Sequence, residues 1–356
     1  MDAFAFIIHP LSPKRDVARK YPFLGRVLPE PAIDFFSRFW PPVHISHVTG
    51  ARSLATGKEI EGWLIAVPYT VQRMLHLPPA EVYRKVIAAG RLAERLGAKI
   101  LGLGAYTSVV GDGGVTIARA LDIAVTSGDS YTAALAIRAV REALRRMDYD
   151  PAAITLAVVG ATGAIGGVVA EGLAGEVGSL LLIGRDQPRL ESIAARLQTA
   201  GARDIQLSTA VADIQRAEVV ITVTSAGGNL VRPEYLRRGA VVCDVSRPRD
   251  VSWQVAQARD DVLVFDGGLV QVPGAVDFGF DYGPPSALTF GCVAETMALA
   301  LEGRFEDYSL GKDLSVERMQ EIDALAEKHG FRLAALRSFE HELPEETIAS
   351  VKANYH

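Results

Sequence analysis

Cysteine is scarce in this sequence. Only Cys243 and Cys292 occur among 356 residues. Two cysteines cannot build the disulfide framework of a small secreted protein, and their spacing matches no zinc site. The low content fits a reducing compartment, and Asp2 stands where a signal peptide would carry basic residues. We therefore expect a cytoplasmic protein without an export signal.

An excess of positive charge is also missing. The 37 Lys and Arg residues are outnumbered by 42 Asp and Glu residues, which gives a net charge of −5. A protein that grips the phosphate backbone of a nucleic acid non-specifically normally carries the opposite sign. We therefore expect no nucleic-acid partner.

Long uncharged stretches are absent with one exception, the 20 residues from Pro151 to Ala170. A stretch of that length could span a bilayer. However, four of its residues are glycines, and three of these have the spacing of a phosphate-binding turn. The pattern predicts a strand and a turn here, and no transmembrane segment.

The composition that remains is that of a globular protein. Hydrophobic residues make up 49% of the chain and charged residues 22%, and the length suggests two domains. In the N-terminal part, apolar residues recur with a helical period over residues 79–97 and 130–147. The apolar run Ile100–Ala105 between them indicates a strand.

The hydrophobic pattern of the sequence changes near residue 154, where short apolar runs begin to alternate with helical segments. This alternation predicts a doubly wound parallel sheet. The expected strands are 154–159, 179–184, 218–223, 240–244 and 262–266. After Gly283-Pro284-Pro285 the pattern is helical again, near 288–302 and 315–329.

The predicted fold class is therefore α/β. A Rossmann-like, doubly wound parallel sheet is joined to a second α/β domain that the C-terminal helices complete. The expected domains are a substrate-binding domain at 1–148, a dinucleotide-binding domain at 149–285, and C-terminal helices at 286–356 that pack back on the substrate domain.

A glycine-rich turn follows the first of these strands. Gly160, Gly163 and Gly166 have the GxxGxxG variant of the dinucleotide fingerprint. The first glycine allows a tight turn, the second lets the backbone approach a diphosphate, and the third brings the helix close to the strand. The helix start then offers free N–H groups to the anion. We expect Gly160, Thr162, Gly163, Ala164, Ile165 and Gly166 to bind the cofactor. Close packing of helix and strand without a ligand is the alternative.

The next strand ends at Gly184-Arg185-Asp186. NAD enzymes usually place an acidic residue at this position, whereas the guanidinium of Arg185 suits the 2′-phosphate of NADP, with Arg189 four residues further on. Asp186 could cap the following helix or bind a ribose. Thr224 and Ser225 follow the 218–223 strand and are expected on the nicotinamide side, or else in an ordinary loop.

Cys292 is expected in the first turn of a helix. That position favours the thiolate, which is the nucleophilic form. A cysteine combined with a nicotinamide suggests one chemistry, in which the sulfur takes up an acyl group and a hydride reduces the thioester to an aldehyde. The alternative is a small, buried, apolar cysteine. Cys243 lies mid-strand among β-branched residues and is expected in the core.

Several segments together resemble a known family. They are Ala55-Thr56-Gly57-Lys58, Ile60-Glu61-Gly62, Leu103–Ser108, Thr126–Ala133, the glycine turn, Phe290–Glu295, Leu301-Glu302-Gly303 and Glu327–Phe331. In order and spacing, over roughly residues 1–335, the chain resembles the long-chain acyl–acyl-carrier-protein reductases first known from cyanobacteria, which form fatty aldehydes.

The resemblance implies that Cys292 is the acylated cysteine, that NADPH is the cofactor, and that the substrate is a fatty acyl carrier protein or acyl-coenzyme A. An aldehyde-consuming enzyme would be a possible partner. Candidate oxyanion donors are Ser108 and Thr107, or the backbone N–H groups beside Cys292. Asp129, Tyr131 or Glu295 could move the proton. The chain departs from the family at Tyr131 and Asp129, which replace a His and an Asn, in the loop 269–287 and in an extended tail.

Other functions remain open. A shikimate-type NADP dehydrogenase would need a Lys/Asp pair in the N-terminal domain, where Lys58, Lys85 and Lys99 resemble surface charges. A non-catalytic NADP-binding sensor is a third interpretation. His44 and His47 are better explained as exposed or structural histidines than as metal ligands, so we expect no metal. The arginine-rich face at Arg138, Arg141, Arg145 and Arg146 could attract an acidic carrier protein or be an ordinary solvated face.

Overall fold

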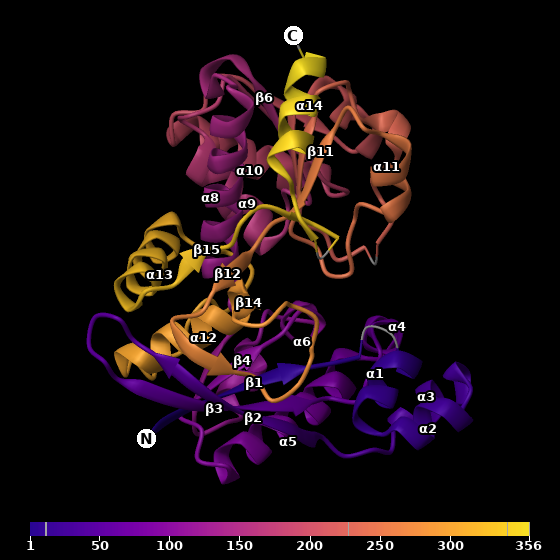
Figure 1. The fold of residues 1–356 in the computed structure, drawn as a ribbon, viewed down its shortest axis with the longest axis vertical. Coiled ribbons are helices and arrows are strands. Elements are labelled where there is room, and N and C mark those ends of the chain that lie inside the picture. The colour runs from indigo at the N-terminus through magenta and orange to yellow at the C-terminus, as the bar shows by residue number, and fades with distance from the viewer. Residues whose placement is uncertain (11–12, 227, 340, 356) are drawn as a thin grey trace. The chain divides into compact units, whose positions relative to one another are not determined.

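The computed structural model describes residues 1–10, 13–226, 228–339 and 341–355. The chain divides into two compact units (Figure 1). The first unit comprises Met1–Gly128, Gln271–Lys312 and Ala324–Arg332, and the second comprises Asp129–Val270, Asp313–Asp323 and Leu333–His356. The chain therefore passes between the units several times.

This division differs from the expected boundaries of 1–148, 149–285 and 286–356. The helix after Gly128 belongs to the second unit, because it packs against a helix and a strand of that unit. The segment that carries Cys292 belongs to the first unit. Residues 286–356 are shared between both units and form no separate part.

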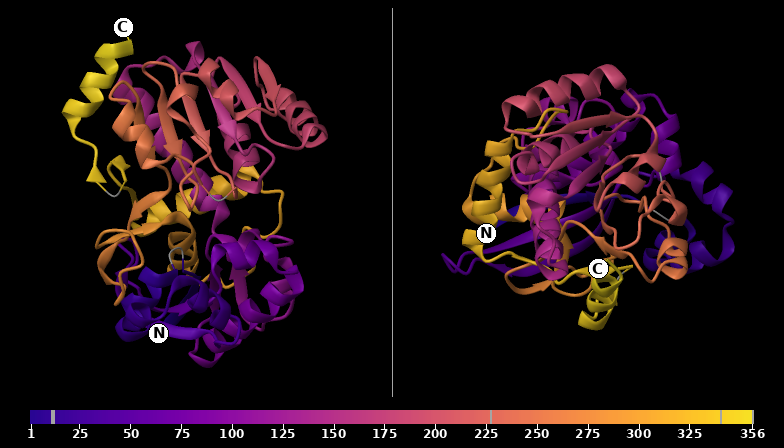
Figure 2. Two further views of the ribbon diagram at one scale, coloured as in Figure 1. Left: turned by 90° about the vertical axis from the view of Figure 1, so that its right-hand side faces the viewer. Right: turned by 90° about the horizontal axis from the view of Figure 1, so that it is seen from above.

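The second unit is built on a six-stranded parallel sheet. Its strands are β6 (Thr155–Val159), β7 (Ser179–Ile183), β8 (Ile205–Ser208), β9 (Val219–Thr222), β10 (Val241–Asp244) and β11 (Leu263–Asp266). Their order is β8-β7-β6-β9-β10-β11, and all neighbours are parallel (Figure 2, left). This is the strand order of the dinucleotide-binding Rossmann fold, which confirms the predicted fold class.

Apolar burial explains why these runs become central strands. Every residue of β9, β10 and β11 is buried, as a strand covered on both faces requires. β8 was not predicted, because its sequence alternates polar and apolar residues and only Ser208 is buried at this edge of the sheet.

The helices and short elements of the second unit surround this sheet. They are α8 (Asp129–Met147), η1 (Pro151–Ala153), α9 (Ala164–Leu173), α10 (Gln187–Thr199), η2 (Val211–Arg216), η3 (Pro233–Tyr235), α11 (Trp253–Ala258), β16 (Arg337–Ser338), β17 (His341–Glu342) and α14 (Glu345–Tyr355). The helix predicted over 130–147 is α8. The uncharged run 151–170 becomes η1, β6 and the start of α9.

The first unit has a mixed sheet in the order β13-β2-β3-β1-β4-β5. Its strands are β1 (Asp2–Ile8), β2 (Val43–Arg52), β3 (Glu59–Ala66), β4 (Ile100–Leu103), β5 (Ala124–Thr126) and β13 (Gly274–Asp277). The strands β3, β1, β4 and β5 are parallel, whereas β2 and β13 are antiparallel to their neighbours. This sheet is the predicted second α/β domain.

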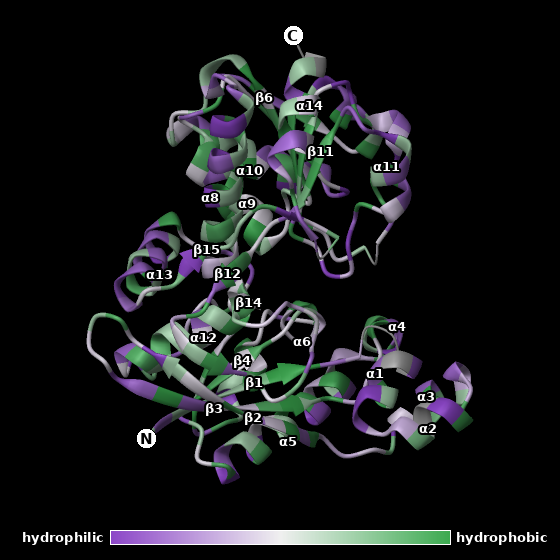
Figure 3. Ribbon diagram, in the orientation of Figure 1, coloured by the Kyte–Doolittle hydropathy of each residue, from purple (hydrophilic) through white to green (hydrophobic). Residues whose placement is uncertain are grey.

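Helices cover this sheet. They are α1 (Pro13–Lys20), α2 (Pro22–Val27), α3 (Glu30–Ser37), α4 (Val71–His76), α5 (Pro79–Arg95), α6 (Tyr106–Val109), α7 (Val115–Arg119) and α12 (Gly291–Glu302). The predicted helix 79–97 is α5, whose Val82, Val86 and Ala89 are buried in one apolar core with β1 and β4. Figure 3 shows how strongly apolar these strands are.

The helix α12 contacts β1, β3 and β4. It begins at Gly291 and not near residue 288, because Leu288–Phe290 form the short strand β14. The chain crosses between the units within β12 (Leu269–Gln271), α13 (Val316–His329) and β15 (Arg332–Leu333), and also after Gly128 and after Lys312. Within the described residues, no helix is long and apolar enough to cross a membrane.

Candidate active site

The glycine turn lies at the carboxyl end of β6, where the strand order of the second sheet reverses. Gly160 has a φ of +92°, and a Cβ at this position would lie 2.4 Å from the carbonyl oxygen of Val223. A Cβ on Gly166 would lie 2.2 Å from the carbonyl oxygen of Gly160. Both positions therefore require glycine, one for the turn and one for the close approach of α9 to the strand.

The start of α9 suits a diphosphate group. Gly163 occupies the N-cap position and has no side chain to accept a hydrogen bond from the first turn. The first amides of a helix have no acceptor inside the helix and carry a partial positive charge. Ala164, Ile165 and Gly166 are the residues whose N–H groups stand there. These residues fit a dinucleotide.

Arg185 and Arg189 lie on either side of the start of α10. Arg185 is exposed directly after β7 and Gly184. Arg189 donates from Nε to the carbonyl oxygen of Thr162 at 2.8 Å, and its guanidinium pairs with Asp313 at 3.2 Å. Asp186 caps α10, because its carboxylate accepts the Arg189 amide at 3.1 Å. Of the two roles open to Asp186, helix capping is the one observed.

A buried polar network holds Thr224 after β9. The Thr224 amide donates to Ser246 Oγ at 2.8 Å, and its hydroxyl donates to Asp250 at 2.8 Å. Ser246 also donates to Asp250 at 2.6 Å. Burial raises the pKa of Asp250, which is fully enclosed. Ser225, next in the chain, is exposed.

Asp244 completes this network at the end of β10. It accepts the amides of Ser246 and Val251, each at 2.9 Å, and burial raises its pKa to about 6. The sequence reasoning missed Asp244, Ser246 and Asp250. The available signal was a pair of acidic residues and a serine just after a buried strand, at the edge where the glycine turn also lies.

Cys292 is the second residue of α12 and is partly exposed. It therefore lies in the first turn of a helix, in the position expected from the sequence. The preceding cap residue, Phe290, offers no side-chain hydrogen bond to the helix start. The partial positive charge of a helix start favours negative charge near the sulfur.

Gly128 packs directly against the cysteine. It has a φ of +78°, and a Cβ there would lie 2.2 Å from Cys292 Cα and 2.3 Å from Cys292 Cβ. Any side chain at this position would displace the cysteine or its helix. The glycine between Ser127 and Asp129 is therefore explained by contact with a residue more than 160 positions away.

Polar contacts join β5 and its following loop to α12. The hydroxyl of Thr126 hydrogen-bonds the carboxylate of Glu295, which is completely buried. Thr296 donates to the carbonyl oxygen of Cys292 at 3.0 Å. Ser127 donates to the carbonyl oxygen of Ser309. Glu295 therefore has a defined role in holding the helix beside the loop that contacts Cys292.

The remaining predicted residues divide between the two units. Thr107 and Ser108 belong to α6 of the first unit, where both are buried and their hydroxyls donate at 2.8 Å to the carbonyls of Gly104 and Ala105. Asp129 and Tyr131 lie in the first turn of α8 in the second unit, directly after Gly128 along the chain. Tyr131 is buried.

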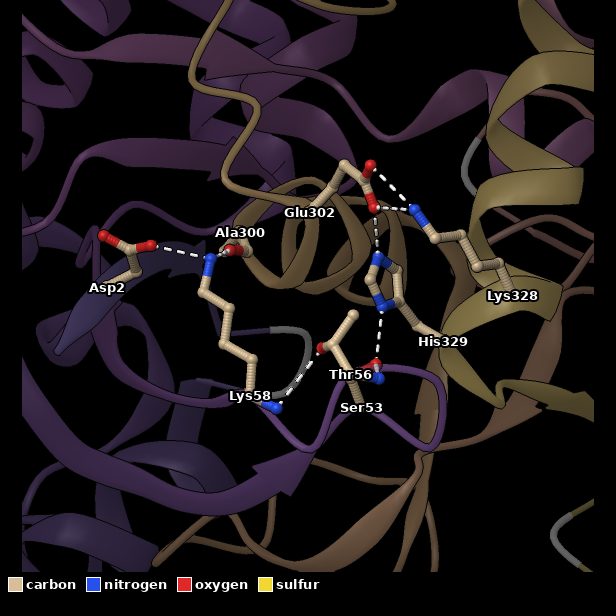
Figure 4. A network of polar contacts seen from close by, with 8 residues as sticks. All are labelled: Asp2, Ser53, Thr56, Lys58, Ala300, Glu302, Lys328 and His329. Atoms are coloured by element: carbon tan, nitrogen blue, oxygen red, sulfur yellow. Dashed lines mark hydrogen bonds and ion pairs between the residues drawn. The ribbon is translucent and has the colours of Figure 1, made fainter.

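The carboxyl end of α12 is held by charged side chains (Figure 4). Lys58 donates from Nζ to the carbonyl oxygen of Ala300 at 3.0 Å and pairs with Asp2 at 2.7 Å, which lowers the pKa of Asp2. A cation at this end of a helix is favoured by the helix dipole. The expectation that Lys58 is a plain surface charge was wrong.

A buried histidine secures the same helix end. His329 hydrogen-bonds Ser53 through Nδ1 and Glu302 through Nε2, each at 2.8 Å (Figure 4). Burial lowers the pKa of His329, and a hydrogen bond from Lys328 lowers the pKa of Glu302. The neutral ring that donates to Glu302 can accept the Ser53 proton, so both contacts are satisfied.

Aromatic side chains precede the cysteine in the loop 269–287 and in β14. The hydroxyls of Tyr282 and Thr289 lie 2.6 Å apart, and the ring of Tyr282 contacts those of Phe278 and Phe290. Burial raises the pKa of Tyr282. The sequence reasoning singled out this loop only for its composition and missed Tyr282.

The two histidines considered as metal ligands lie on β2. His47 stacks on Trp63, with 4.2 Å between ring centroids, and its Nε2 hydrogen-bonds Glu61 at 2.9 Å. His44 meets the edge of the same indole at 5.5 Å. These contacts hold both histidine rings in place against Trp63. Within the described residues, no group of three or more metal-ligating side chains is found.

The chain was compared with known protein families and proteins. Residues 141–266 match the family described as shikimate/quinate 5-dehydrogenase. Among curated proteins, aminotransferase PigE of Serratia sp. is 32% identical over 368 residues, which cover 99% of this chain and 42% of that protein. The chain thus spans less than half the length of that relative.

A second curated relative is similar in length to this chain. The long-chain acyl-[acyl-carrier-protein] reductase of Synechococcus elongatus is 27% identical over 343 residues, which cover 92% of this chain and 96% of that protein. It is the type of enzyme that the sequence motifs resemble.

Solved structures with similar folds include two dehydrogenases. L-tryptophan dehydrogenase from Nostoc punctiforme has a TM-score of 0.44 at 11% identity and covers 99% of this chain and 87% of its own. Shikimate 5-dehydrogenase from Listeria monocytogenes, in complex with shikimate and NAD, has a TM-score of 0.39 at 12% identity and covers 90% and 96%. The family match over 141–266 and the geometry of the glycine turn together show a dehydrogenase-type domain for a nicotinamide dinucleotide.

Proposed function

We propose that this protein reduces a long-chain fatty acyl thioester to a fatty aldehyde with NADPH, through an acyl group carried on Cys292. The observation that carries the proposal is the position of Cys292, in the first turn of α12 and locked against Gly128. The likeness to the acyl-[acyl-carrier-protein] reductase supports it, because that likeness extends over 92% of the chain.

The first half-reaction is acyl transfer to sulfur. The Cys292 thiolate attacks the carbonyl carbon of the thioester, and the resulting tetrahedral adduct expels the carrier as a thiolate, which takes up a proton. The helix start favours the thiolate of Cys292 over the thiol. The acyl group then remains on the protein as a new thioester.

The second half-reaction is reduction. When bound, NADPH supplies a hydride that converts the acyl thioester into a hemithioacetal anion. This anion expels the aldehyde and regenerates the Cys292 thiolate. The turn from Gly160 to Gly166 would hold the diphosphate, Arg185 the 2′-phosphate, and Thr224 with Ser225 the nicotinamide side.

Both half-reactions develop negative charge on the carbonyl oxygen, which needs hydrogen-bond donors. The amides of the first turn of α12 are the candidates nearest to Cys292 in the chain. Ser108 and Thr107 would have to release their present carbonyl acceptors in order to donate. Asp129, Tyr131 and Glu295 remain the proposed groups for the carrier's proton.

The shikimate-type alternative has a specific test in the geometry. A Lys/Asp pair does exist in the first unit, because both Lys58 and Lys99 pair with Asp2, at 2.7 Å and 2.6 Å. These residues stand where β1, β3 and β4 begin. Ligands of open α/β sheets bind at the opposite edge, outside the carboxyl ends of the strands. The pairing of Asp2 with Lys58 is therefore better explained as stabilising the end of α12 than as binding a substrate.

The experiment is intact-mass analysis with acyl-carrier and acyl-coenzyme A donors in the absence of NADPH. We expect one acyl group on the protein, lost on addition of NADPH with release of aldehyde. Cys292→Ser should abolish both events and retain NADPH binding. Cys243→Ser is the matched control, because Cys243 is fully buried in β10 and burial raises its pKa.

Three outcomes would contradict the proposal. Turnover without an acylated protein would exclude the covalent route. NADPH binding without oxidation by any thioester would favour the sensor. Oxidation of a hydroxy acid by both the wild type and Cys292→Ser would favour the shikimate-type dehydrogenase.

A further inference from the structure

The segment from α1 to the end of α3 carries an unusual surface. Large apolar side chains are exposed at six positions between residues 21 and 39: Tyr21, Phe23, Val27, Phe35, Phe36 and Phe39. Phe23 is 75% exposed and Phe39 is 64% exposed. Folding normally leaves such side chains scattered singly, so six within 19 residues require an explanation. We call these six residues the apolar patch.

The patch is not a frayed end, because its inner face is anchored. α3 buries Ile33 and Ser37. Asp34 between them pairs with Arg73 of α4 at 2.7 Å and accepts the Thr70 hydroxyl at 2.6 Å. Lys85 of α5 donates to the Trp40 carbonyl at 2.7 Å. The opposite face of α3 therefore presents its phenylalanines in a fixed arrangement.

The phenylalanines form one cluster with a cation. The ring of Phe35 meets those of Phe36 and Phe39 at centroid distances of 5.3 Å and 6.0 Å. The guanidinium of Arg38 lies 4.9 Å from the Phe39 ring and 5.8 Å from the Phe35 ring. α1 contacts both α2 and α3, so the cluster belongs to one small group of helices (Figure 1).

The charge of this segment is opposite to that of the whole chain. Residues 13–40 contain six basic and three acidic residues, whereas the chain has a net charge of −5. Asp34 is paired with Arg73 of α4, outside the segment, whereas Asp16 pairs with Arg19, a basic residue of the segment that also pairs with Asp281. Lys14, Arg26 and Arg38 are exposed. Figure 3 shows polar and apolar residues side by side along α1, α2 and α3.

We propose that residues 13–40 dock on the surface of an anionic lipid bilayer. Exposed phenylalanines combined with Lys and Arg match the boundary between headgroups and acyl chains, where rings insert and cations meet anionic lipids. The helices have six to eight residues and are too short to span a bilayer, so in the proposed complex they lie in its interface. An acidic partner protein would account for the basic residues but would leave the exposed rings unexplained.

The test is vesicle flotation of the full chain with phosphatidylcholine alone and with added phosphatidylglycerol. We expect binding to the anionic vesicles that weakens in high salt. Phe35→Ser/Phe39→Ser and Arg26→Glu/Arg38→Glu should each reduce partitioning by about tenfold or more. Trp253→Ser and Arg203→Glu are the matched controls, because they change an exposed aromatic ring and an exposed cation in the second unit.

A second measurement locates the contact. Trp40 follows Phe39, so brominated acyl chains should quench tryptophan emission in the wild type and much less in Trp40→Phe. Failure of the wild type to float, or equal losses in the patch variants and the controls, would overturn the proposal. Binding of an acyl carrier protein through the patch without any vesicle binding would do the same. Thermal unfolding of each variant shows whether the first unit is intact, and cofactor binding shows the same for the second unit. Neither measurement depends on the proposed reaction.

Discussion

The two units build their candidate sites in different ways. In the second unit, the glycine turn is one continuous run from Val159 to Gly166, and it offers backbone N–H groups to a ligand. In the first unit, the surroundings of Cys292 come from its own helix and from Gly128, in the loop that follows β5 and is bonded through Ser127 to Ser309. A site made from one segment leaves its pattern in the sequence, whereas a site made from distant segments does not.

The largest expected effect separates the two sites. Gly128→Ala should slow acylation of Cys292 by about 100-fold, because a Cβ would displace the cysteine, and a displacement of 1 Å can cost that much. It should leave NADPH affinity unchanged. Gly160→Ala should do the reverse, because its Cβ would collide with Val223. Acylation is measured by intact mass, and NADPH binding by fluorescence titration.

Two further glycines control for backbone strain. Gly97 in the first unit and Gly201 in the second have φ values of +84° and +95°, and a Cβ at either would meet nothing within 4 Å. Their alanine variants should lose stability through strain alone and keep both measured activities. If Gly97→Ala slowed acylation as much as Gly128→Ala, general destabilisation would explain both results.

The six-stranded sheet of the second unit could be predicted because its buried strands are short apolar runs. Of these six strands, only the half-exposed edge strand β8 was missed. The glycine turn could also be predicted from the sequence, because its glycines are required by backbone geometry within the turn itself. The role of Gly128 could not be predicted, because the atom that it must avoid belongs to Cys292. His329 appeared only within a motif of the resemblance, and Lys58 also as a surface charge. The structure explains both through the end of α12.

A second prediction tests cofactor choice within the second unit. Arg185→Ala should raise the KM for NADPH by about 10- to 100-fold, because charge-assisted hydrogen bonds to the 2′-phosphate would be lost. The KM for NADH should change little. Arg203→Ala, an exposed arginine of the same unit, is the control. An equal loss with both cofactors would remove Arg185 from the 2′-phosphate and point to the diphosphate instead.

A third prediction compares how the stability of each unit changes as the pH falls. Burial lowers the pKa of His9 in the first unit to about 4, below the ordinary value of 6.5. The unfolded chain therefore binds more protons between these values, and stability falls as the pH drops through them. At pH 5 the loss relative to neutral pH is about 2 kcal/mol.

Asp244 in the second unit has the opposite sign. Burial raises its pKa from 3.8 to about 6, so the folded state binds the extra proton and gains about 1 kcal/mol between pH 7 and pH 5. Hydrogen exchange should show weaker protection of β1 at pH 5 and steadier protection of β10. His9→Gln should remove the acid sensitivity of β1. Parallel loss of protection in both sheets, unaffected by that variant, would refute this account.

The smallest expected effect concerns the far end of the cysteine helix. Lys58→Met should lower the free energy of unfolding by about 1 kcal/mol, because the Ala300 carbonyl loses its cation at the negative end of the helix dipole. Acylation should slow severalfold as α12 loosens. Lys99→Met is the matched control, since Lys99 also pairs with Asp2 but is more exposed, with 53% of its side chain accessible compared with 31% for Lys58. Thermal unfolding measures the change in stability, and intact mass measures the rate of acylation. If the two variants behaved alike, the loss of stability would come from the ion pair with Asp2 and not from the end of α12. The position of the sulfur would then depend on its contact with Gly128 alone.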